Sequence, residues 1–339
     1  MAQDKVTSLD VAKRAGVSQS AVSRVFTPGA SASPATVAKV RAAAEELGYR
    51  PNPLARAMIT GKSRIIGLIV AYLDNQFYPL ALERLSRALQ ARGYHVLVFM
   101  AANSSDDVST VMKELVDYKV DGIITASVGI TNELAALCQS AGIPVVMFNR
   151  GQDDARLSRV TSDNRAGGRA VAQFLVAGGH RRIAHIAGWQ GASTGRDRAA
   201  GFVAGLADHG MEPVAVVDGA YDRDVAAQAA RDLFSGAEKP DAVFVGNDHM
   251  AFAVMDVLRF EMGLRIPLDV SVVGYDDVPM AAWPAYDLTS LRQPINRLVA
   301  ATLETLMAQI DGQPDPRQVE IPGPLIIRGS ARKVEGLTP

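Results

Sequence analysis

Hydrophobic positions divide the chain into a short N-terminal region and a long remainder with a different rhythm. In the first region apolar residues recur every three or four positions, which is typical of amphipathic helices. From residue 64 onward, short and nearly continuous apolar runs alternate with helical segments. Such runs predict strands that are buried on both faces of a parallel sheet covered by helices. The pattern predicts an all-α headpiece followed by an α/β core.

The first two predicted helices lie close together in "VTSLDVAKRAGVSQSAVSRVFT". Thr7 and Asp10 form a capping box that begins the first helix, and Gly16 can adopt a positive φ and end it. Ser18 can cap the second helix. We expect these residues to face inward: Leu9, Val11, Ala12, Ala15, Ala21, Val22 and Val25. Two helices joined by so short a turn must cross steeply, which is helix-turn-helix geometry.

A third helix completes the predicted headpiece. Ser33 is a suitable N-cap, Pro34 suits the first helical position, and Gly48 ends the run. The residues expected to face inward are Val37, Val40, Ala44 and Leu47. Three short helices then enclose one minimal core.

The second helix leaves a polar face outside the predicted core. Its N-terminal end can enter a major groove. Gln19 can pair bidentately with adenine and Arg24 with guanine, with Ser20 beside them. Ser18 and Ser23 are short donors suited to phosphates. The alternative is a helical hairpin with a solvated polar face.

Charge supports a nucleic-acid partner for this end of the chain. Residues 1–62 hold nine Lys or Arg and four Asp or Glu, a balance of +5. The whole chain carries −1, so the remainder carries −6. A basic end on an acidic body favours a polyanion partner for the headpiece alone.

Residues 49–62, "YRPNPLARAMITGK", follow the headpiece. "PLARAMIT" could form about two helical turns, which is too short to be stable alone in water. Met58 and Ile59 have no evident core here, and an apolar side chain can wedge between base steps in a minor groove. An ordinary flexible linker is the alternative.

The body contains two similar sets of predicted strands. The first set is 64–73, 95–101, 121–127 and 144–149, and the second is 182–188, 214–219, 241–247 and 271–277. Ligands of such sheets bind at the carboxyl ends of the strands, so two facing lobes predict a cleft.

Polar and aromatic residues near the strand ends are candidates for that cleft. The polar ones are Asn75, Thr125, Ser127, Asn149, Arg150, Asp163, Asn164, Asn247 and Asp248, with Arg198 just past a strand. An Arg and an Asp that face each other can bind vicinal hydroxyls. The rings that could stack on a ligand are Phe77, Tyr78, Trp189, Tyr221 and Trp283. For any single residue, a cap or a structural turn is the alternative.

Motifs for catalysis and cofactor binding are missing. The sequence holds no GxGxxG after a first strand, no GxxxxGK[ST], no GxSxG and no HExxH. The carboxylates of "GYDD" (274–277) could hold magnesium, but a structural strand end is favoured. We therefore expect a protein that is not an enzyme and uses no cofactor or metal.

Other features of the sequence indicate the cellular compartment in which the protein works. The lone Cys138 cannot form an internal disulfide, and we expect it at a buried helix position in a reducing cytosol. No secretory signal or membrane-spanning run is evident, so we expect a cytoplasmic protein. A solute-binding protein for transport is a second hypothesis, which the absent signal and the headpiece disfavour.

The residues resemble those of the LacI/GalR family of bacterial transcription regulators over essentially the whole chain. The likeness rests on "LDVAKRAGVSQSAVSRVF", "LGYRPNPLARAM", "DGIIT", "GHRRIA", "GNDHMA" and "SVVGYDD". It implies a helix-turn-helix domain at 1–52, a hinge helix at 53–62 and a periplasmic-binding-protein-like core at 64–339. Lobe 1 would be about 64–163 with 292–322, and lobe 2 about 164–291 with 323–339.

The resemblance also implies roles for particular residues. Those expected at DNA are Thr7, Ser18, Gln19, Ser20, Ser23, Arg24, Asn52 and Met58, where Met58 stands at a wedge position that usually holds leucine. The residues that the resemblance places at a small-molecule effector are Phe77, Asn149, Arg198, Tyr221 and Asp248. We expect Tyr78, Thr125, Asp163, Thr194 and Trp283 to contact it as well. Arg198 and Asp248 are the firmest of these.

The implied function is that of a regulator, most simply a repressor, which binds a pseudo-palindromic double-stranded operator as a homodimer. Its half-sites would lie about one helical turn apart. The expected effector is a sugar or sugar derivative, and a nucleobase-like corepressor is the alternative.

Overall fold

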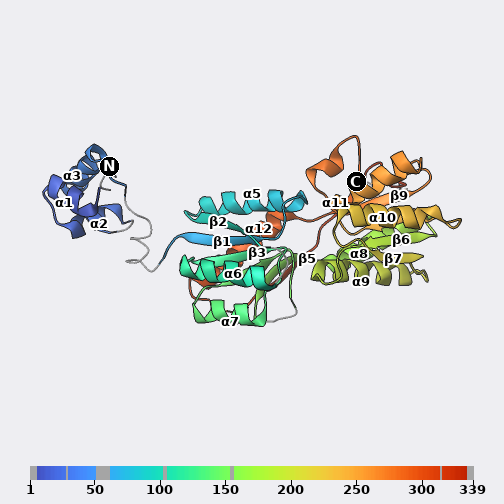
Figure 1. The fold of residues 1–339 in the computed structure, drawn as a ribbon, viewed down its shortest axis with the longest axis horizontal. Coiled ribbons are helices and arrows are strands. Elements are labelled where there is room, and N and C mark those ends of the chain that lie inside the picture. The colour runs from blue at the N-terminus through green and yellow to red at the C-terminus, as the bar shows by residue number, and fades with distance from the viewer. Residues whose placement is uncertain are drawn as a thin grey trace. The chain divides into compact units, whose positions relative to one another are not determined.

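The computed structural model describes residues 6–27, 30–50, 62–101, 105–152, 156–313 and 315–333. The chain divides into two compact units, residues 1–64 and 65–339, which we call the headpiece and the core (Figure 1). The predicted hinge segment lies outside the described residues, apart from Lys62, and so do Asn52 and Met58.

Helices α1 (Ser8–Ala15), α2 (Gln19–Phe26) and α3 (Pro34–Glu46) form the headpiece. The capping box is present, because the Thr7 N–H donates to Asp10 Oδ2 at 2.9 Å and the Asp10 N–H donates to Thr7 Oγ1 at 3.4 Å. Gly16 ends α1 with φ of 65°, a conformation that costs glycine little. The local signals read from the sequence therefore set the helix-turn-helix as expected.

The headpiece core is small and draws on all of its helices. Its buried members are Val11, Ala12, Val22, Val40, Ala43 and Ala44. The prediction for Leu9 is wrong, because its side chain is 47% exposed. Leu9 stands in the first turn of α1.

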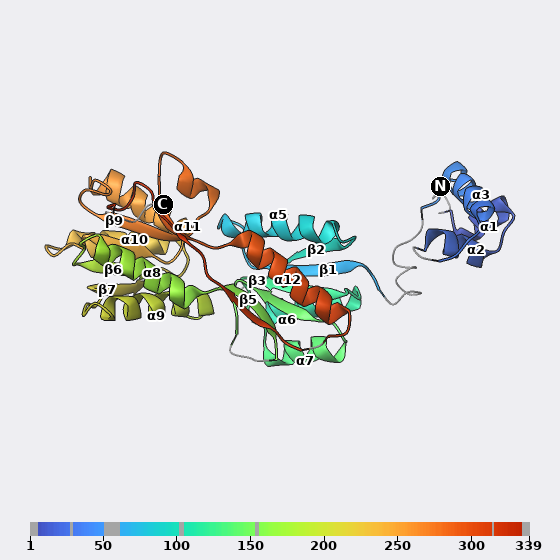
Figure 2. The same cartoon turned by 180° about the vertical axis from the view of Figure 1, so that it is seen from behind.

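Lobe 1 of the core is a parallel sheet in the order β11-β5-β4-β3-β1-β2. Its strands are β1 (Ile65–Val70), β2 (His95–Met100), β3 (Gly122–Ala126), β4 (Val145–Phe148), β5 (Ser158–Ser162) and β11 (Gln318–Ile321). Helices α5 (Phe77–Gln90) and α12 (Ile295–Ile310) cover one face, and α6 (Ser105–Asp117) and α7 (Asn132–Ser140) cover the other (Figure 2).

Lobe 2 repeats this plan in the order β12-β10-β9-β8-β6-β7. Its strands are β6 (Ile183–Ala187), β7 (Ala215–Asp218), β8 (Ala242–Val245), β9 (Ser271–Asp276), β10 (Thr289–Arg292) and β12 (Leu325–Ile326), of which β12 alone runs antiparallel to its neighbour. Helices α8 (Asn164–Ala177) and α9 (Ser193–Ala207) cover one face, and α10 (Arg223–Ser235) and α11 (Asp248–Asp256) the other.

The chain passes between the lobes at three places among the described residues. These are the β5-to-α8 step at residue 163, the β10-to-α12 step at 293–294 and the β11-to-β12 step at 322–324. The fold class predicted from the alternating apolar runs is confirmed.

Two further observations concern the single cysteine and the character of the helices. Cys138 lies in α7 with its side chain 1% exposed, and burial raises the pKa of its thiol to about 11. None of the helices in the described ranges has the length and apolar character needed to span a membrane.

Candidate DNA-binding helix and effector cleft

The polar face of α2 is exposed and held only by local hydrogen bonds. Gln19 Nε2 donates to Ser8 Oγ at 3.0 Å, and Arg24 Nε donates to the Ser20 carbonyl at 3.4 Å. Ser18 Oγ accepts the Ala21 N–H at 3.2 Å and so caps the helix. Gln19, Ser20 and Arg24 are exposed, so a new partner could replace these contacts at little cost.

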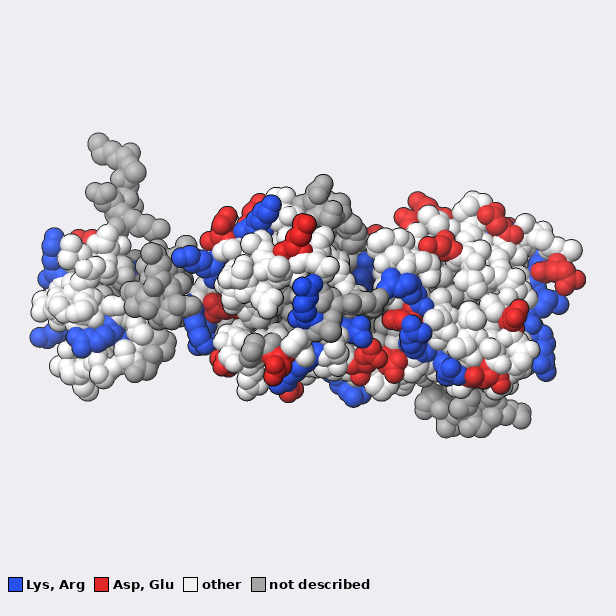
Figure 3. Space-filling view, turned by 90° about the horizontal axis from the view of Figure 1, so that it is seen from below, with Lys and Arg blue, Asp and Glu red and all other residues white. Residues whose placement is uncertain are grey.

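The other described residues predicted at DNA are placed less uniformly. Thr7 is exposed, but its hydroxyl serves the capping box of α1. Ser23 is half-buried. On the face seen in Figure 3, Lys and Arg outnumber Asp and Glu over the headpiece, whereas both signs mix over the core. The described part of the headpiece therefore presents a basic surface on this face.

Residues of both lobes line a small, partly open cavity in the core. Its lining residues are Tyr72, Asn75, Phe77, Tyr78, Asn149, Arg150, Thr194, Arg198, Tyr221, Asn247 and Asp276. Many of these follow the carboxyl ends of strands, because parallel strands deliver their loops to the same edge of a sheet. The cavity contains six of the ten predicted effector residues, namely Phe77, Tyr78, Asn149, Thr194, Arg198 and Tyr221.

The backbone of this wall is strained at several points. Asn149, Tyr221 and Asp276 have φ of 69°, 58° and 115°. Non-glycine residues rarely adopt positive φ, and such strain gathers where the surrounding structure holds side chains in working positions. The ring of Tyr221 also lies where a Cβ on Gly188 would stand, since that atom would be 2.1 Å from Tyr221 Cζ.

Arg198 is the cationic centre of the cavity, with its side chain 3% exposed. Its Nη2 lies 3.4 Å from Asp276 Oδ1, its Nε donates to Asn164 Oδ1 at 2.9 Å, and its Nη1 donates to the Gly246 carbonyl at 2.6 Å. The guanidinium also stacks 3.7 Å from the ring centroid of Tyr275. These contacts fix the group in one orientation.

Close packing of α8 on α9 positions Arg198. A Cβ added to Gly168 would lie 2.2 Å from the Arg198 carbonyl oxygen, and one added to Gly201 would lie 2.1 Å from the Arg165 carbonyl oxygen. Only glycine permits the two backbones to approach this closely.

Asp276, rather than Asp248, is the carboxylate that faces Arg198. Gln293 Nε2 also donates to Asp276 Oδ1, at 2.7 Å. Burial raises the pKa of Asp276 to about 6, although Arg198 and Gln293 oppose the shift. Asp276 and Arg198 thus bring a carboxylate and a guanidinium together in the cavity wall.

The structure places Asp248 behind the cavity wall. Its side chain is fully buried, and it accepts hydrogen bonds from the Ser290 hydroxyl at 2.6 Å and the Val278 N–H at 2.9 Å. Burial and the charge of Asp276 raise its pKa well above the usual range. Asp248 therefore ties α11 to the segment around β9 and β10, which is a structural role.

The remaining predicted effector residues also lie outside this cavity. Thr125 is buried within β3, and its hydroxyl has no hydrogen-bond partner. Asp163 caps α8 by accepting the Ala166 N–H at 2.9 Å, and it lines a separate cavity beside Arg159. Trp283 is 53% exposed after the short helix Pro279–Ala282.

The lining residues missing from the predicted set are Tyr72, Asn75, Arg150, Asn247 and Asp276. Three of these, Asn75, Arg150 and Asn247, were already candidates because they follow strands. Asp276 was interpreted as a structural strand end, although the same strand-end rule applies to it. Tyr72 gave no signal beyond its place just after β1.

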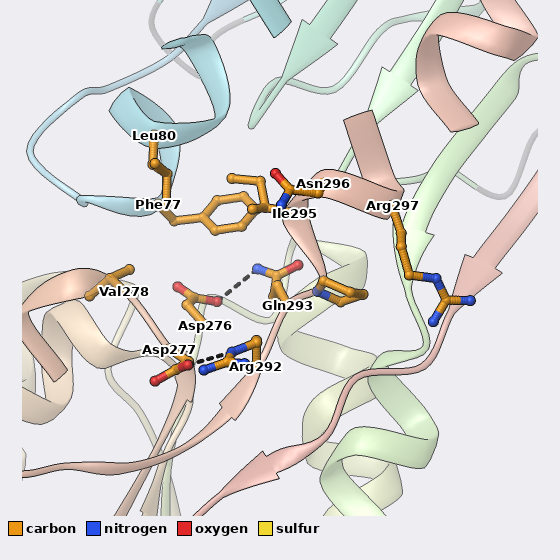
Figure 4. A pocket seen from close by; sticks show the side chains of 11 residues that line it. Phe77, Leu80, Asp276, Asp277, Val278, Arg292, Gln293, Ile295, Asn296 and Arg297 are labelled. Carbon is orange, nitrogen blue, oxygen red and sulfur yellow. Dashed lines mark hydrogen bonds and ion pairs between the residues drawn. The ribbon is translucent and has the colours of Figure 1, made fainter. Parts of the chain in front are cut away.

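A second cavity adjoins the first at Phe77 and Asp276 (Figure 4). It is lined further by the β10-to-α12 crossover, where Gln293 points toward Asp276 and Arg292 pairs with Asp277 at 2.6 Å. Arg297 points away from this group. The two cavities together follow the boundary between the lobes, so a ligand in either would contact both.

Comparisons with known proteins agree with this architecture. Residues 7–52 match the family model of bacterial regulatory proteins of the lacI family, and residues 172–331 match a periplasmic binding protein-like domain. The HTH-type transcriptional repressor PurR of Vibrio vulnificus (strain CMCP6) is 30% identical over 97% of this chain and 99% of its own.

Solved structures give the same result. A Lac repressor dimer bound to operator and the anti-inducer ONPF aligns with TM-score 0.88 at 28% identity, over 96% of this chain and 99% of that chain. A complex of the transcriptional regulator CelR with cellobiose aligns with TM-score 0.73 at 32% identity, over 96% of this chain and 100% of that chain. Since the likeness covers the headpiece and both lobes, the chain belongs to the LacI family of bacterial regulatory proteins.

Proposed function

We propose that this LacI-family regulator binds a pseudo-palindromic operator as a homodimer and changes its affinity when a sugar or sugar derivative enters the cleft. The proposal is carried by one combination: an exposed polar helix on a basic headpiece, joined to a two-lobed core with a polar cavity. A repressor is its simplest form, in the cytoplasm with the DNA.

The α2 surface supports the DNA-binding part. Gln19, Ser20 and Arg24 can reach base edges, and Ser18 can approach a phosphate. The solved Lac repressor complex is a dimer on operator DNA, which supports a two-fold arrangement here as well. Two headpieces would then read half-sites about one helical turn apart.

The cavity supports a hydroxylated effector. Arg198 offers donors and Asp276 offers acceptors, the pattern that binds neighbouring hydroxyls, while Phe77 and Tyr221 supply ring faces. The CelR relative was solved with a sugar, cellobiose. The cavity rings also leave a nucleobase-like corepressor as the second candidate.

We propose that the cleft binds its ligand and performs no chemistry on it. The described part of the chain contains no cluster of His, Cys, Asp and Glu suited to a metal ion. Binding energy could instead be used to change the lobe arrangement, at a coupling of about 1–3 kcal/mol in typical allostery.

Selection from a random duplex pool, followed by fluorescence anisotropy, tests the DNA-binding part. We expect one half-site motif repeated with two-fold symmetry. Arg24→Ala should lose about 10- to 100-fold in affinity for that site, because a bidentate base contact contributes about 1–3 kcal/mol of discrimination. Arg41→Ala, an exposed change on α3, is the matched control.

Two outcomes would contradict the proposal. Selection that yields no sequence preference with any effector present would exclude operator reading. Equal affinities of Arg24→Ala and wild type would remove α2 from base contact. A panel of sugars, polyols and nucleobases, added to the operator complex, identifies the effector class and the direction of its effect.

A further inference from the structure

Arg150 is a buried cation in the wall of the effector cavity. It follows β4 and is 6% exposed. Its Nη1 donates to the Ser127 carbonyl at 2.7 Å and its Nη2 to the Tyr72 hydroxyl at 2.8 Å. Its Nε is buried and has no hydrogen-bond partner. Both hydrogen-bond partners of this guanidinium among the described residues are therefore neutral.

The charges of the cavity do not balance. Its charged lining residues are Arg150, Arg198 and Asp276, which leaves one excess positive charge when Asp276 is ionised. Asp276 lies against Arg198 and Gln293. None of the carboxylates in the described ranges forms an ion pair with Arg150, and its neighbour in the chain, Asn149, has a neutral amide.

Aromatic rings surround Arg150 without neutralising it. The guanidinium carbon lies 5.8 Å from the ring centroid of Tyr72, 5.9 Å from Trp189 and 5.6 Å from Tyr221. These distances are near the limit of about 6 Å for a cation–π contact, so each contact is weak. Tyr221 and Trp189 belong to lobe 2, so the cation of lobe 1 lies near aromatic rings of the opposite lobe.

A buried cation that lacks an anionic partner is costly to keep. Proteins tolerate such a group where a ligand completes it, because a charge-assisted hydrogen bond to a carboxylate or phosphate is stronger than a neutral one. Arg150 meets this description, since it is held rigidly by Ser127 and Tyr72 and retains an unused donor.

We propose that the effector is an anionic sugar derivative, whose carboxylate or phosphate group pairs with Arg150 while its hydroxyls contact Arg198 and Asp276. This inference rests on the proposed function, because it specifies the ligand of the same cleft. The competing explanation is that Arg150 only braces the loops after β1 and β3 through Tyr72 and Ser127.

Isothermal titration calorimetry on the full chain tests the inference with matched sets of sugars. One set is D-glucose, D-gluconate and D-glucose 6-phosphate, and the other is D-galactose, D-galacturonate and D-galactose 6-phosphate. We expect at least one anionic member to bind ten or more times tighter than its neutral counterpart. The carboxylate and phosphate members within a set distinguish the two sources of charge.

Variants of Arg150 give the decisive comparison. Arg150→Gln should weaken binding of the anionic sugar tenfold or more, and Arg150→Lys should retain part of it. Arg92→Gln, an exposed change near the end of α5, should bind as wild type does. The Tm of the empty Arg150→Gln protein should be equal to or above that of wild type, because a buried unpaired charge is removed.

Three results would overturn the inference: neutral sugars that bind at least as tightly as their anionic counterparts, a panel in which no anionic member binds, or anionic binding that Arg150→Gln leaves unchanged. A lower Tm of that variant with unchanged anion binding would assign Arg150 the bracing role. If Arg150→Gln does not fold, Arg150→Lys supplies the comparison. Operator binding, measured separately on wild type, tests the proposed function independently.

Discussion

At the scale of single residues, two buried aspartates next to one another in space have different tasks. Asp248 accepts hydrogen bonds from the Ser290 hydroxyl and the Val278 N–H behind the cavity wall, whereas Asp276 faces Arg198 in the cavity. Both pKa values are raised, chiefly by burial, so titration alone does not distinguish them. Their hydrogen-bond partners do, because those of Asp248 are structural groups.

Substitution should separate the two aspartates. Asp276→Asn should weaken effector binding tenfold or more. Asp248→Ala should lower the free energy of unfolding by about 1–3 kcal/mol, because the Ser290 hydroxyl and Val278 N–H lose their acceptor in a buried site. Urea denaturation and calorimetry measure the two effects, and a reversed pattern would exchange the roles.

Effector binding should depend on pH through Asp276. Its pKa in the folded chain is about 6, above the ordinary value of 3.8, so the folded state holds the proton more tightly than the unfolded state. This carboxyl therefore favours folding below pH 4, and that contribution is lost as pH rises through 6.

Sugar hydroxyls need the ionised carboxylate as acceptor, so affinity should fall about tenfold from pH 7 to pH 5, one unit below the pKa. The calorimetric titration repeated at both values checks this. Asp276→Asn should show a flat profile over the same range, and a wild-type affinity that stays constant would argue against Asp276 as the acceptor.

At the scale of elements, the contact between α8 and α9 carries Arg198 into the cleft. Gly168→Ala should destabilise the chain by about 1–3 kcal/mol, because the added methyl group would overlap the Arg198 carbonyl oxygen. The same shift should weaken effector binding. Gly236→Ala at the end of α10 is the matched control, since its added Cβ meets nothing within 4 Å.

The denaturant midpoint measures this prediction. If Gly168→Ala and Gly236→Ala unfold at the same urea concentration, the close approach of α8 and α9 does not determine stability. A loss of effector binding without a change in midpoint would instead show that the helix pair tunes only the position of Arg198.

Elements were predictable from the sequence because their signals are local. The capping box at Thr7, the positive φ at Gly16 and the buried apolar runs each depend on a few neighbouring residues. Whether a side chain faces inward or outward was harder to predict near the ends of the elements, as Leu9 shows. Its helical spacing is right, but it stands in the first turn of α1 and outside the buried cluster of the headpiece.

The cleft was predictable only in part because its composition depends on the direction of side chains after each strand. The strand-end rule selected Asn149 and Asp248 equally well, yet only Asn149 lines the cavity. At Asp276 and Asp277 the backbone turns through φ of 115° and 53°, which no periodicity encodes. Trp283 was chosen for its ring alone and lies exposed.

At the scale of the whole molecule, the lobes contact one another beside the cavity. The Gly151 N–H of lobe 1 donates to Ser193 Oγ of lobe 2 at 3.0 Å, and His249 Nε2 of lobe 2 lies 3.7 Å from Asp74 Oδ2 of lobe 1. A ligand that bridges the lobes can shift the balance of such contacts, because it adds contacts of its own to both sides. Binding of a metabolite in the cleft can thereby affect the rest of the chain.

The uneven charge of the molecule leads to a prediction for operator binding. Residues 1–62 carry +5 and the remainder −6, so attraction to phosphates comes from the headpiece while the core repels them. Each neutralised phosphate releases counterions, which lowers the logarithm of the binding constant by about 0.9 per phosphate for each unit of log salt.

With several phosphate contacts from each headpiece of a dimer, operator affinity should fall by about 10³ or more between 50 and 200 mM KCl, the range typical of six or more contacts. The effector site lies inside the core, so the affinity for the effector should change far less over the same range of salt concentration. Anisotropy and calorimetry at four salt concentrations compare the two. An operator affinity that is flat in salt would mean that the basic headpiece does not bind the phosphate backbone, whatever α2 does at the bases.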